Sequence, residues 1–489
     1  TTIRHSYPHD WRSKTPVVFR ATEQWFIGVD RATERDGRSL REAALAATES
    51  VRFVPEWGRN RFRGMVESRP DWCISRQRSW GLPIPAFQSP DGTTLLTAAS
   101  VRAVAEVFRR EGSDAWFARS AAELLAAYDP SSDPDAPEGL DVAALEKLHD
   151  IFDVWFESGS SWNAVLRARD IGYPAELYLE GSDQHRGWFQ LSMLPALGAT
   201  GESPFRTLLT HGFIVDRDGR KMSKSGGNAL SVDDLLKDFG AEVCRWWVSS
   251  ISYDGDVKAD SELFKVAGDS YRKVRNTIRF LLSNLADAED LQPGGEGIEP
   301  HSLDGWALAQ TAACERRVRD AYRRYDFKGA HLAIHALCNE TLSAVYCAAV
   351  KDRLYCDRPD SPRRRRTQRA MREIVEVLIR LVAPILPHTA DEALQCLPGT
   401  AEDASAATLV HRGLEVPVAS AWSTLMAMRE EAMKALERAK ASGIENPLDA
   451  AVVLPDVDGG LTAFAEDLAD LLGVSRVRLD PTAEAIVVE

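Results

Sequence analysis

The sequence predicts an α/β fold followed by an all-α fold, and three patterns support this. An apolar run over 177–181 precedes a polar string, as at the end of a buried strand in an open α/β sheet. A second apolar run, 207–215, leads into a loop rich in Gly and Ser. From residue 264 onward apolar residues recur at helical spacing, and antiparallel helices of this length form a bundle.

The first part of the chain is predicted to hold short strands and an insertion. Residues 16–27 alternate apolar residues with breaks, which indicates short strands. Prolines 83 and 85 prevent a helix near 82–85. Residues 91–148 are predicted as an insertion, with helices over 101–110 and 121–128.

The second part is predicted to be mainly helical. Helices are expected over 232–239 and 241–248, and longer helical stripes cover 306–325, 330–350 and 369–397. The final segment combines a helix over 423–440 with strands at 451–454 and 477–479, which predicts a small α+β appendage.

Size and composition limit the class of protein. A chain of 489 residues usually forms two to four domains. We expect a cytoplasmic protein without a membrane segment, because no apolar run approaches the length of a membrane span. The seven cysteines include no Cys-x-x-Cys pair, so neither a disulfide framework nor a zinc site is predicted.

The net charge of -14 by itself argues against nucleic acid as a partner, because binding to phosphates depends on Lys and Arg. The basic residues are clustered, however, so the net charge is a poor guide. Arg272, Arg275 and Arg279 share one side of a predicted helix and are candidates for binding nucleic-acid phosphates. The run Arg363–Arg366 has two open interpretations, a solvated helix face and a nucleic-acid contact.

The loop at 218–229 carries two lysines three residues apart, in the string Lys221, Met222, Ser223, Lys224 and Ser225. Two mobile point charges suit a reaction in which charge builds up on a polyphosphate and then leaves. Lys-x-x-Lys alone is more often a generic surface pair. The flanking Gly212-Phe213 and Gly227-Asn228 favour nucleotide activation instead.

This string resembles the signature loop of class I aminoacyl-tRNA synthetases. Three further strings resemble the isoleucyl-tRNA synthetases of that class, while valyl and leucyl relatives share the lysine loop. These strings are RPDWCISRQR at 69–78, DVWFESG at 153–159 and YLEGSDQHRGWF at 178–189. Gly226 departs from the pattern, since the family usually has an apolar residue there.

The resemblance implies the C-terminal portion of a longer enzyme, because the His-x-Gly-His signature of the class is missing and residues 5–12 resemble the end of the editing insertion. It implies half of a Rossmann-type catalytic domain, then an anticodon-binding helical bundle and the appendage. The expected domains are the end of the editing insertion and its return ribbon (1–50), the catalytic domain (51–90 and 149–228), the insertion (91–148), a stem-contact linker (229–265), the bundle (266–410) and the appendage (411–489).

The resemblance also implies the chemistry. The intact enzyme would use ATP and Mg²⁺ to form isoleucyl-adenylate and esterify tRNA(Ile), whereas this chain alone is expected to be an inactive monomer. Lys221 and Lys224 are the expected catalytic residues, and no metal ligand is expected. The expected adenylate-binding residues are Glu180, Gly181, Asp183, Gln184, Trp188 and Trp155, although both tryptophans also fit a plain core. With this resemblance, the phosphates expected at Arg272, Arg275 and Arg279 are those of tRNA. The alternatives are a non-catalytic tRNA-binding protein derived from such an enzyme, and a valyl or leucyl relative.

Overall fold

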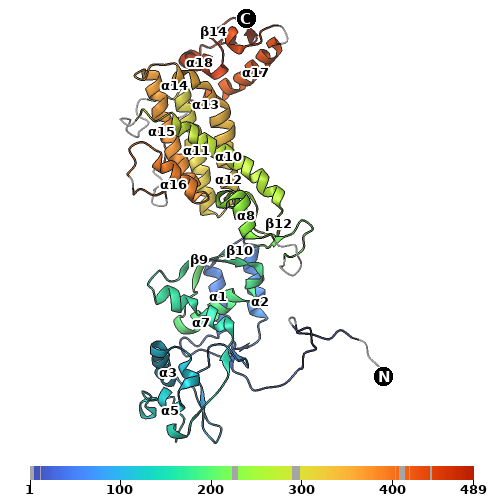
Figure 1. The fold of residues 1–489 in the computed structure, drawn as a ribbon, viewed down its shortest axis with the longest axis vertical. Coiled ribbons are helices and arrows are strands. Elements are labelled where there is room, and N and C mark those ends of the chain that lie inside the picture. Colours follow the sequence, from blue (N-terminus) through green and yellow to red (C-terminus); the bar gives the residue numbers. More distant parts are fainter. Residues whose placement is uncertain are drawn as a thin grey trace. The chain divides into compact units, whose positions relative to one another are not determined.

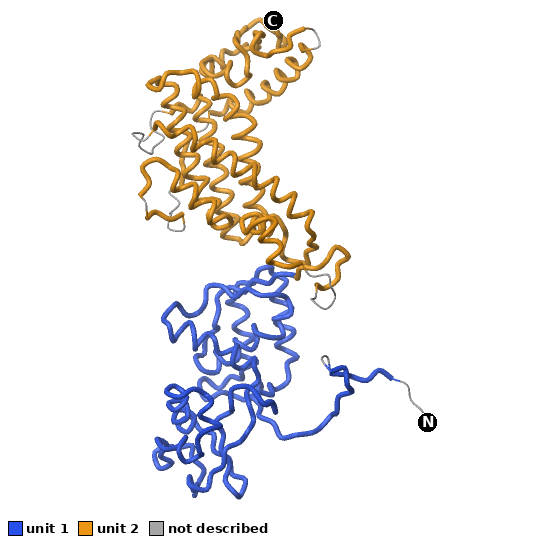
Figure 2. Tube along the Cα trace, viewed as in Figure 1, with its two compact units in different colours: residues 1–212 blue, residues 213–489 orange. Residues whose placement is uncertain are grey.

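The computed structural model describes residues 5–10, 13–222, 230–288, 298–401, 403–406, 413–417, 419–440 and 443–489. The chain forms two compact units, Thr1–Gly212 and Phe213–Glu489 (Figure 2). Strands and helices are mixed in the first unit, and helices dominate the second (Figure 1). Among the described residues, no helix is both long and apolar enough to cross a membrane.

A three-stranded parallel sheet lies at the centre of the first unit. β10 (Phe205–His211) pairs on one side with β2 (Arg52–Val54) and on the other with β9 (Ala175–Gly181). The strand predicted at 177–181 is confirmed as the end of β9. The run predicted as one strand over 207–215 is two strands, because β10 ends at His211 and β11 (Ile214–Val215) pairs in the second unit with β12 (Val257–Lys258).

Three helices pack with this sheet around a shared apolar core (Figure 1). They are α1 (Leu40–Ser50), α2 (Trp57–Glu67) and α7 (Trp188–Thr200). The helix α7 is apolar on nearly every side, which suits a helix enclosed by protein. A short helix α6 (Val154–Gly159) packs against α7 and continues into the π-helix η3 (Trp162–Arg167).

The insertion has its own small core around the buried Trp116. The predicted helix at 121–128 is shorter than expected, since α5 ends at Leu124. The elements of the insertion are β5 (Phe87–Gln88), β6 (Thr94–Leu95), α3 (Ala98–Glu111), α4 (Ala115–Ala118), α5 (Ala121–Leu124) and β7 (Glu146–Lys147). Next to it, β1 (Phe26–Ile27) pairs with β3 (Trp72–Cys73), and β4 (Ser75–Arg76) pairs with β8 (Ile151–Phe152).

The second unit is a helical bundle with the predicted appendage at its end. Its helices are α8 (Val232–Phe239), α9 (Ala241–Ser250), α10 (Ser261–Ser283), α11 (Leu303–Arg323), α12 (Phe327–Ala336), α13 (Cys347–Ala349), α14 (Lys351–Tyr355), α15 (Pro362–Val382) and α16 (Pro387–Gln395). The appendage consists of α17 (Trp422–Lys440), β13 (Ala451–Pro455), α18 (Ala465–Leu472), β14 (Arg476–Asp480) and β15 (Val487–Val488). Both parts share one apolar core, in which the Trp422 ring lies 5.8 Å from that of Trp306 and 5.0 Å from that of Phe464.

Two predicted helices differ from the structure. The stripe at 330–350 contains a π-helical stretch, η6 (Leu337–Tyr346), between α12 and α13. The stripe at 369–397 is divided into α15 and α16, because Pro384 and Pro387 cannot continue a helix.

The arginine run of α15 fits neither of its two interpretations. Its members make ion pairs inside the unit, Arg363 with Asp357 at 3.1 Å and Arg364 with Asp287 at 2.7 Å. The side chain of Arg364 is only 12 % exposed. The run therefore stabilises the bundle and offers little free charge to a ligand.

Candidate functional site

The first four predicted adenylate-binding residues lie together at the carboxyl end of β9, where ligands of open α/β sheets bind. Glu180 and Asp183 are exposed, Gln184 is half-buried and Gly181 is buried. The Gly181 N–H donates to Glu180 Oε2 at 3.2 Å, and Gln184 Nε2 donates to Asp183 Oδ2 at 3.2 Å. Two carboxylates therefore face solvent at the end of the strand.

A glycine just beyond this turn keeps three polar and aromatic groups close. A Cβ at Gly187 would lie 2.6 Å from Gln184 Oε1 and 3.5 Å from the Trp155 ring. Gln184 Oε1 also accepts a hydrogen bond from the Trp188 backbone N–H at 3.0 Å. Any larger residue at Gly187 would therefore push the Gln184 amide out of place.

The two predicted tryptophans have different surroundings. The Trp188 ring stacks on Tyr178 at 4.2 Å, and its indole N–H donates to the Ser158 carbonyl at 2.9 Å. Trp155 is 37 % exposed and lines a cavity of 620 Å³. Trp155 is thus the tryptophan that faces open space, whereas Trp188 packs against the core of the unit.

This cavity is rich in arginine. It also borders α7 and the string that begins at residue 69. Its lining residues are Met65, Ser68, Arg69, Pro70, Asp71, Trp72, Cys73, Arg76, Asp153, Trp155, Arg186, Gly187, Gln190 and Leu191. Three guanidinium groups against two carboxylates favour an anionic ligand.

Arg69 connects the cavity to the turn after β9. Its guanidinium donates to Gln190 Oε1 at 3.0 Å, and Gln190 Nε2 donates to the His185 carbonyl at 2.7 Å. Burial lowers the pKa of Arg69, but an arginine remains protonated at neutral pH. This chain of hydrogen bonds holds the turn η4 (Ser182–His185) in place.

Asp153 fixes the position of Trp155. It is buried, accepts a hydrogen bond from Trp72 Nε1 at 3.1 Å and pairs with Arg76 at 3.1 Å. Its other oxygen caps α6 by accepting the Trp155 N–H at 3.4 Å. The buried carboxylate thus ties the start of α6 to the arginine-rich wall of the cavity.

His185 is a structural residue. It is fully buried, its Nε2 lies 2.9 Å from Thr210 Oγ1, and its ring stacks on Trp57 at 5.8 Å. Burial lowers the pKa of His185 to about 4, so the ring is neutral at physiological pH.

The lysine loop is described only at its start, in the second unit. Lys221 forms an antiparallel bridge with Val215, and Met222 packs against the core of the bundle. Ser223, Lys224 and Ser225 lie outside the described residues. Their placement therefore remains a prediction.

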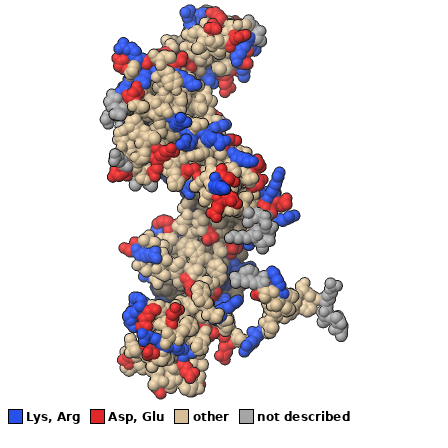
Figure 3. Space-filling model, viewed as in Figure 1, with Lys and Arg blue, Asp and Glu red and all other residues tan. Residues whose placement is uncertain are grey.

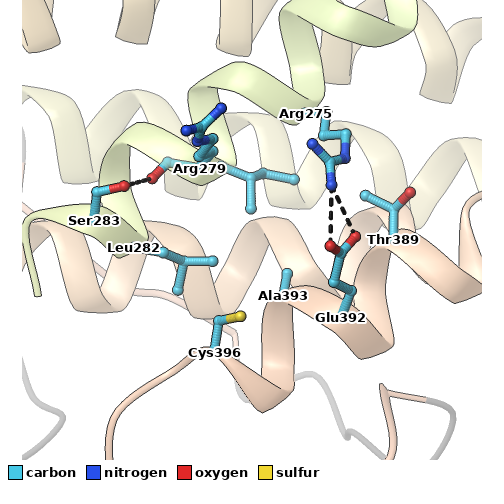
Figure 4. Close-up of a pocket in the computed structure, with 9 residues that line it drawn as sticks. Arg275, Arg279, Leu282, Ser283, Thr389, Glu392, Ala393 and Cys396 are labelled. Carbon is cyan, nitrogen blue, oxygen red and sulfur yellow. Dashed lines mark hydrogen bonds and ion pairs between the residues drawn. The ribbon is translucent and has the colours of Figure 1, made fainter. Parts of the chain in front are cut away.

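The predicted tRNA-binding arginines line one side of α10. Arg272 pairs with Asp269, and Arg275 makes two hydrogen bonds of 3.0 and 3.1 Å with Glu392 of α16 (Figure 4). Arg279 makes no ion pair with any described residue and points away from Glu392 in the same view. On the face drawn in Figure 3, basic and acidic side chains are interspersed over the described parts of both units.

Sequence reasoning missed the arginines of the cavity and the aspartate that orients α6. Arg69 and Arg76 belong to the quoted string at 69–78, Asp153 begins the string at 153–159, and Arg186 lies in the string at 178–189. These residues could have been predicted from the sequence, because each string contains a charged residue next to an apolar or aromatic one. Within the described part of the chain, no group of three or more His, Cys, Asp or Glu side chains could hold a metal ion.

Comparisons with known proteins agree along the whole chain. The family model "tRNA synthetases class I (I, L, M and V)" matches residues 10–260, and "Anticodon-binding domain of tRNA ligase" matches residues 304–453. An isoleucine–tRNA ligase of Desulfitobacterium hafniense is 40 % identical over 99 % of this chain and 52 % of its own length. One of Geobacter sulfurreducens is 42 % identical over 98 % of this chain and 51 % of its own. The chain thus spans about half the length of these curated relatives.

Solved structures share the fold. A methionyl-tRNA synthetase of Mycobacterium tuberculosis bound to methionyl-adenylate has a TM-score of 0.52 and 20 % identity, covering 84 % of this chain and 70 % of its own. A LeuRS of Agrobacterium radiobacter K84, in a ternary complex with tRNA and LeuAMS, has a TM-score of 0.50 and 19 % identity, covering 71 % of this chain and 44 % of its own. Since the first family model alone covers residues 10–260 of 489, the chain belongs to the class I tRNA synthetases.

Proposed function

We propose that this chain forms part of an isoleucine–tRNA ligase, which activates isoleucine with ATP and transfers it to tRNA(Ile) in the cytoplasm. The observation that carries the proposal is the 40 % identity to isoleucine–tRNA ligases over 99 % of the chain. The arginine-rich cavity beside the end of β9 supports it, because adenylate formation needs an anion-binding site next to an amino-acid site.

Activation joins the isoleucine carboxylate to the α-phosphate of ATP and expels pyrophosphate. In our proposal the exposed carboxylate of Glu180 binds the α-ammonium of the substrate, and Gly181 lets the ligand approach the backbone. Asp183 and Gln184 complete the polar side of the site. Trp155, which faces open space, walls the amino-acid side.

Trp188 is proposed as the second wall of the amino-acid site, with its ring held by Tyr178. Lys221 and Lys224 neutralise the phosphates of ATP and the leaving pyrophosphate. Mg²⁺ would be bound through the substrate phosphates, since such sites often use only one or two protein carboxylates.

The bundle is proposed to contact tRNA(Ile) through Arg272, Arg275 and Arg279 on one side of α10. Of these three arginines, Arg279 makes no ion pair with any described residue. Phosphate contacts release counterions, so the affinity of the chain for tRNA should fall steeply with salt. Equal affinity for unrelated tRNAs, or affinity that is flat between low and moderate salt, would contradict this part.

Isoleucine-dependent pyrophosphate exchange tests the proposed activity. The enzyme used in this assay should contain this chain joined to a counterpart of the other half of the curated relatives, which this chain does not span. Exchange should be faster with isoleucine than with valine or leucine. Lys224→Ala should lower kcat by roughly two to four orders of magnitude, as for loss of a charge that acts in the transition state. Lys434→Ala, at an exposed pair with Glu431, is the matched control and should leave the rate unchanged. Equal rates for Lys224→Ala and the control would remove Lys224 from the catalytic residues.

A further inference from the structure

A polar groove of 280 Å³ lies on the helical bundle between α10 and the segment formed by η6, α13 and α14. Apart from the threonine in its floor, its polar lining residues are Lys273 and Asn276 from α10, and Asn339, Ser343 and Lys351 from the opposite wall. All of them are exposed or half-buried. At about 30 Å³ for each water, the groove has room for a group the size of a phosphate with its sugar.

The backbone geometry of both walls aligns these side chains. On α10 the lining residues Lys273, Asn276, Thr277 and Phe280 follow the spacing that places residues on one helical face. On the other wall Asn339, Ser343, Cys347 and Lys351 are each four residues apart. Asn339 and Ser343 lie in the π-helical stretch η6, and π-helical turns are frequent at functional sites.

The floor of the groove is firmly held. Thr277 is buried, and its hydroxyl lies 3.0 Å from the Lys273 carbonyl and 3.1 Å from the Cys338 carbonyl of η6. Cys347 beneath the groove is also buried. The two walls are therefore joined by a hydrogen bond, and their polar groups sit on a fixed base.

The donors on the walls are available for a ligand. The side chains of Lys273, Asn276, Asn339, Ser343 and Lys351 make no hydrogen bond or ion pair with any residue that the structure describes. No carboxylate lines the groove. The nearby Glu340 and Asp352 are exposed and lie outside the lining.

Lys273 faces away from Arg275, one of the arginines predicted to bind tRNA. Residues two apart on a helix are separated by about 200° around its axis, so Lys273 and Arg275 face opposite directions. Arg275 is already bound to Glu392 by two hydrogen bonds, whereas the Lys273 ammonium has no such partner in the part of the chain that the structure describes. The groove also shares no lining residue with the cavity that Arg275 and Arg279 line, so the two are separate sites.

We infer that this groove binds the sugar-phosphate backbone of RNA, a deeper claim that rests on the proposed function in tRNA aminoacylation. Two ammonium groups with amide and hydroxyl donors are the side chains that contact phosphate oxygens and ribose in nucleic-acid complexes. The amide groups of Asn276 and Asn339 can also accept a hydrogen bond from a ribose 2′-hydroxyl.

The test is the salt dependence of tRNA(Ile) binding by the full chain. The double variant Lys273→Gln/Lys351→Gln should lose about tenfold in affinity at moderate salt, and its slope of log K against log salt should decrease by about two, one unit for each lost phosphate contact. The matched control Lys265→Gln/Lys434→Gln removes the same net charge at exposed pairs with Glu262 and Glu431 and should change affinity less than about twofold.

Three results would each contradict a different part of the proposal, and a fourth would support it. If the unsubstituted chain does not bind tRNA(Ile), the proposed tRNA contact and the groove site both fail. If it binds but the two double variants have the same slope, only the groove site is overturned. Lysine-dependent binding of inorganic pyrophosphate that competes with tRNA would reassign the groove to a free anion and overturn the RNA assignment. Protection of residues 339–351 from hydrogen exchange by tRNA in the unsubstituted chain, and its loss in the groove variant, is the supporting second measurement.

Discussion

Gly159 offers a sharp test of how the first unit is packed. It ends α6, and a Cβ placed there would lie 2.0 Å from the Leu191 carbonyl oxygen of α7. Both groups in this contact belong to the backbone, so no side-chain rotation can relieve it. Gly159→Ala must therefore move α6 away from α7.

The size of the effect follows from this distance. Ordinary contact begins at 3.4 Å, so the carbonyl must retreat by about 1.4 Å. Overpacking of this kind costs typically 1–3 kcal/mol and sometimes more, and we expect about 3 kcal/mol here because two backbones must separate. For a unit of about 200 residues this corresponds to a fall in Tm of roughly 6–12 °C.

Gly64→Ala is the matched control in the same unit. Gly64 lies inside α2, is exposed and has no neighbour within 4 Å of an added Cβ. Since alanine favours a helix, this change should stabilise the unit by about 0.5–1 kcal/mol. Hydrogen exchange of the α7 amides, followed by mass spectrometry, reports on the first unit alone. Equal protection in Gly159→Ala and the unsubstituted chain would refute the close packing of α6 on α7.

Three other parts of the molecule give testable outcomes. Asp467→Asn should lower the free energy of unfolding of the second unit by about 3 kcal/mol, measured by urea titration, because it weakens the buried ion pair with Arg353. The control Lys434→Gln, at an exposed ion pair, should change this free energy by less than about 0.5 kcal/mol. Burial lowers the pKa of His331 to about 4, so between pH 6.5 and 4 the unfolded state binds more protons than the folded state. The free energy of unfolding should therefore fall by up to about 3 kcal/mol as the pH drops through this window. In the variant His331→Gln, this part of the pH dependence should be absent. Gly187→Ala should lower kcat/KM for isoleucine by roughly 100-fold in pyrophosphate exchange, and an unchanged value would exclude a role for the Gln184 position.

The sequence predicted the elements with strong periodicity and missed those decided by packing. The strand at 177–181 and the helices α8 and α9 were found from apolar spacing. The break between α15 and α16 was missed although Pro384 and Pro387 were visible, because the apolar stripe continues through them. The π-helical stretch η6 has no comparable sequence signal, and it contacts another helix through the Thr277 hydroxyl, which donates to the Cys338 carbonyl.

The site was predicted only in part, for a related reason. A polar string marked the end of β9, and the resemblance led to the prediction of Glu180 to Gln184 as adenylate-binding residues, a role that stays a prediction. The role of Asp153 could not, because it depends on a hydrogen bond to Trp72 and an ion pair with Arg76 from a distant part of the chain. Spacing along a chain identifies residues on one face, but it does not show which side chains from elsewhere meet them.

The same limit applies to charge, and it decides which surface of the bundle can bind RNA. An arginine held by a carboxylate gains little from a phosphate, because the new contact replaces an existing one of similar strength. Arg275 is in this position, bound to Glu392 by two hydrogen bonds. Lys273 and Lys351 make no ion pair with any residue that the structure describes, so a phosphate contact there replaces no existing one. In a chain with a net charge of -14, Lys273 and Lys351, which have no ion pair with any described residue, should therefore contribute more to phosphate binding than Arg272 and Arg275, which are held by carboxylates.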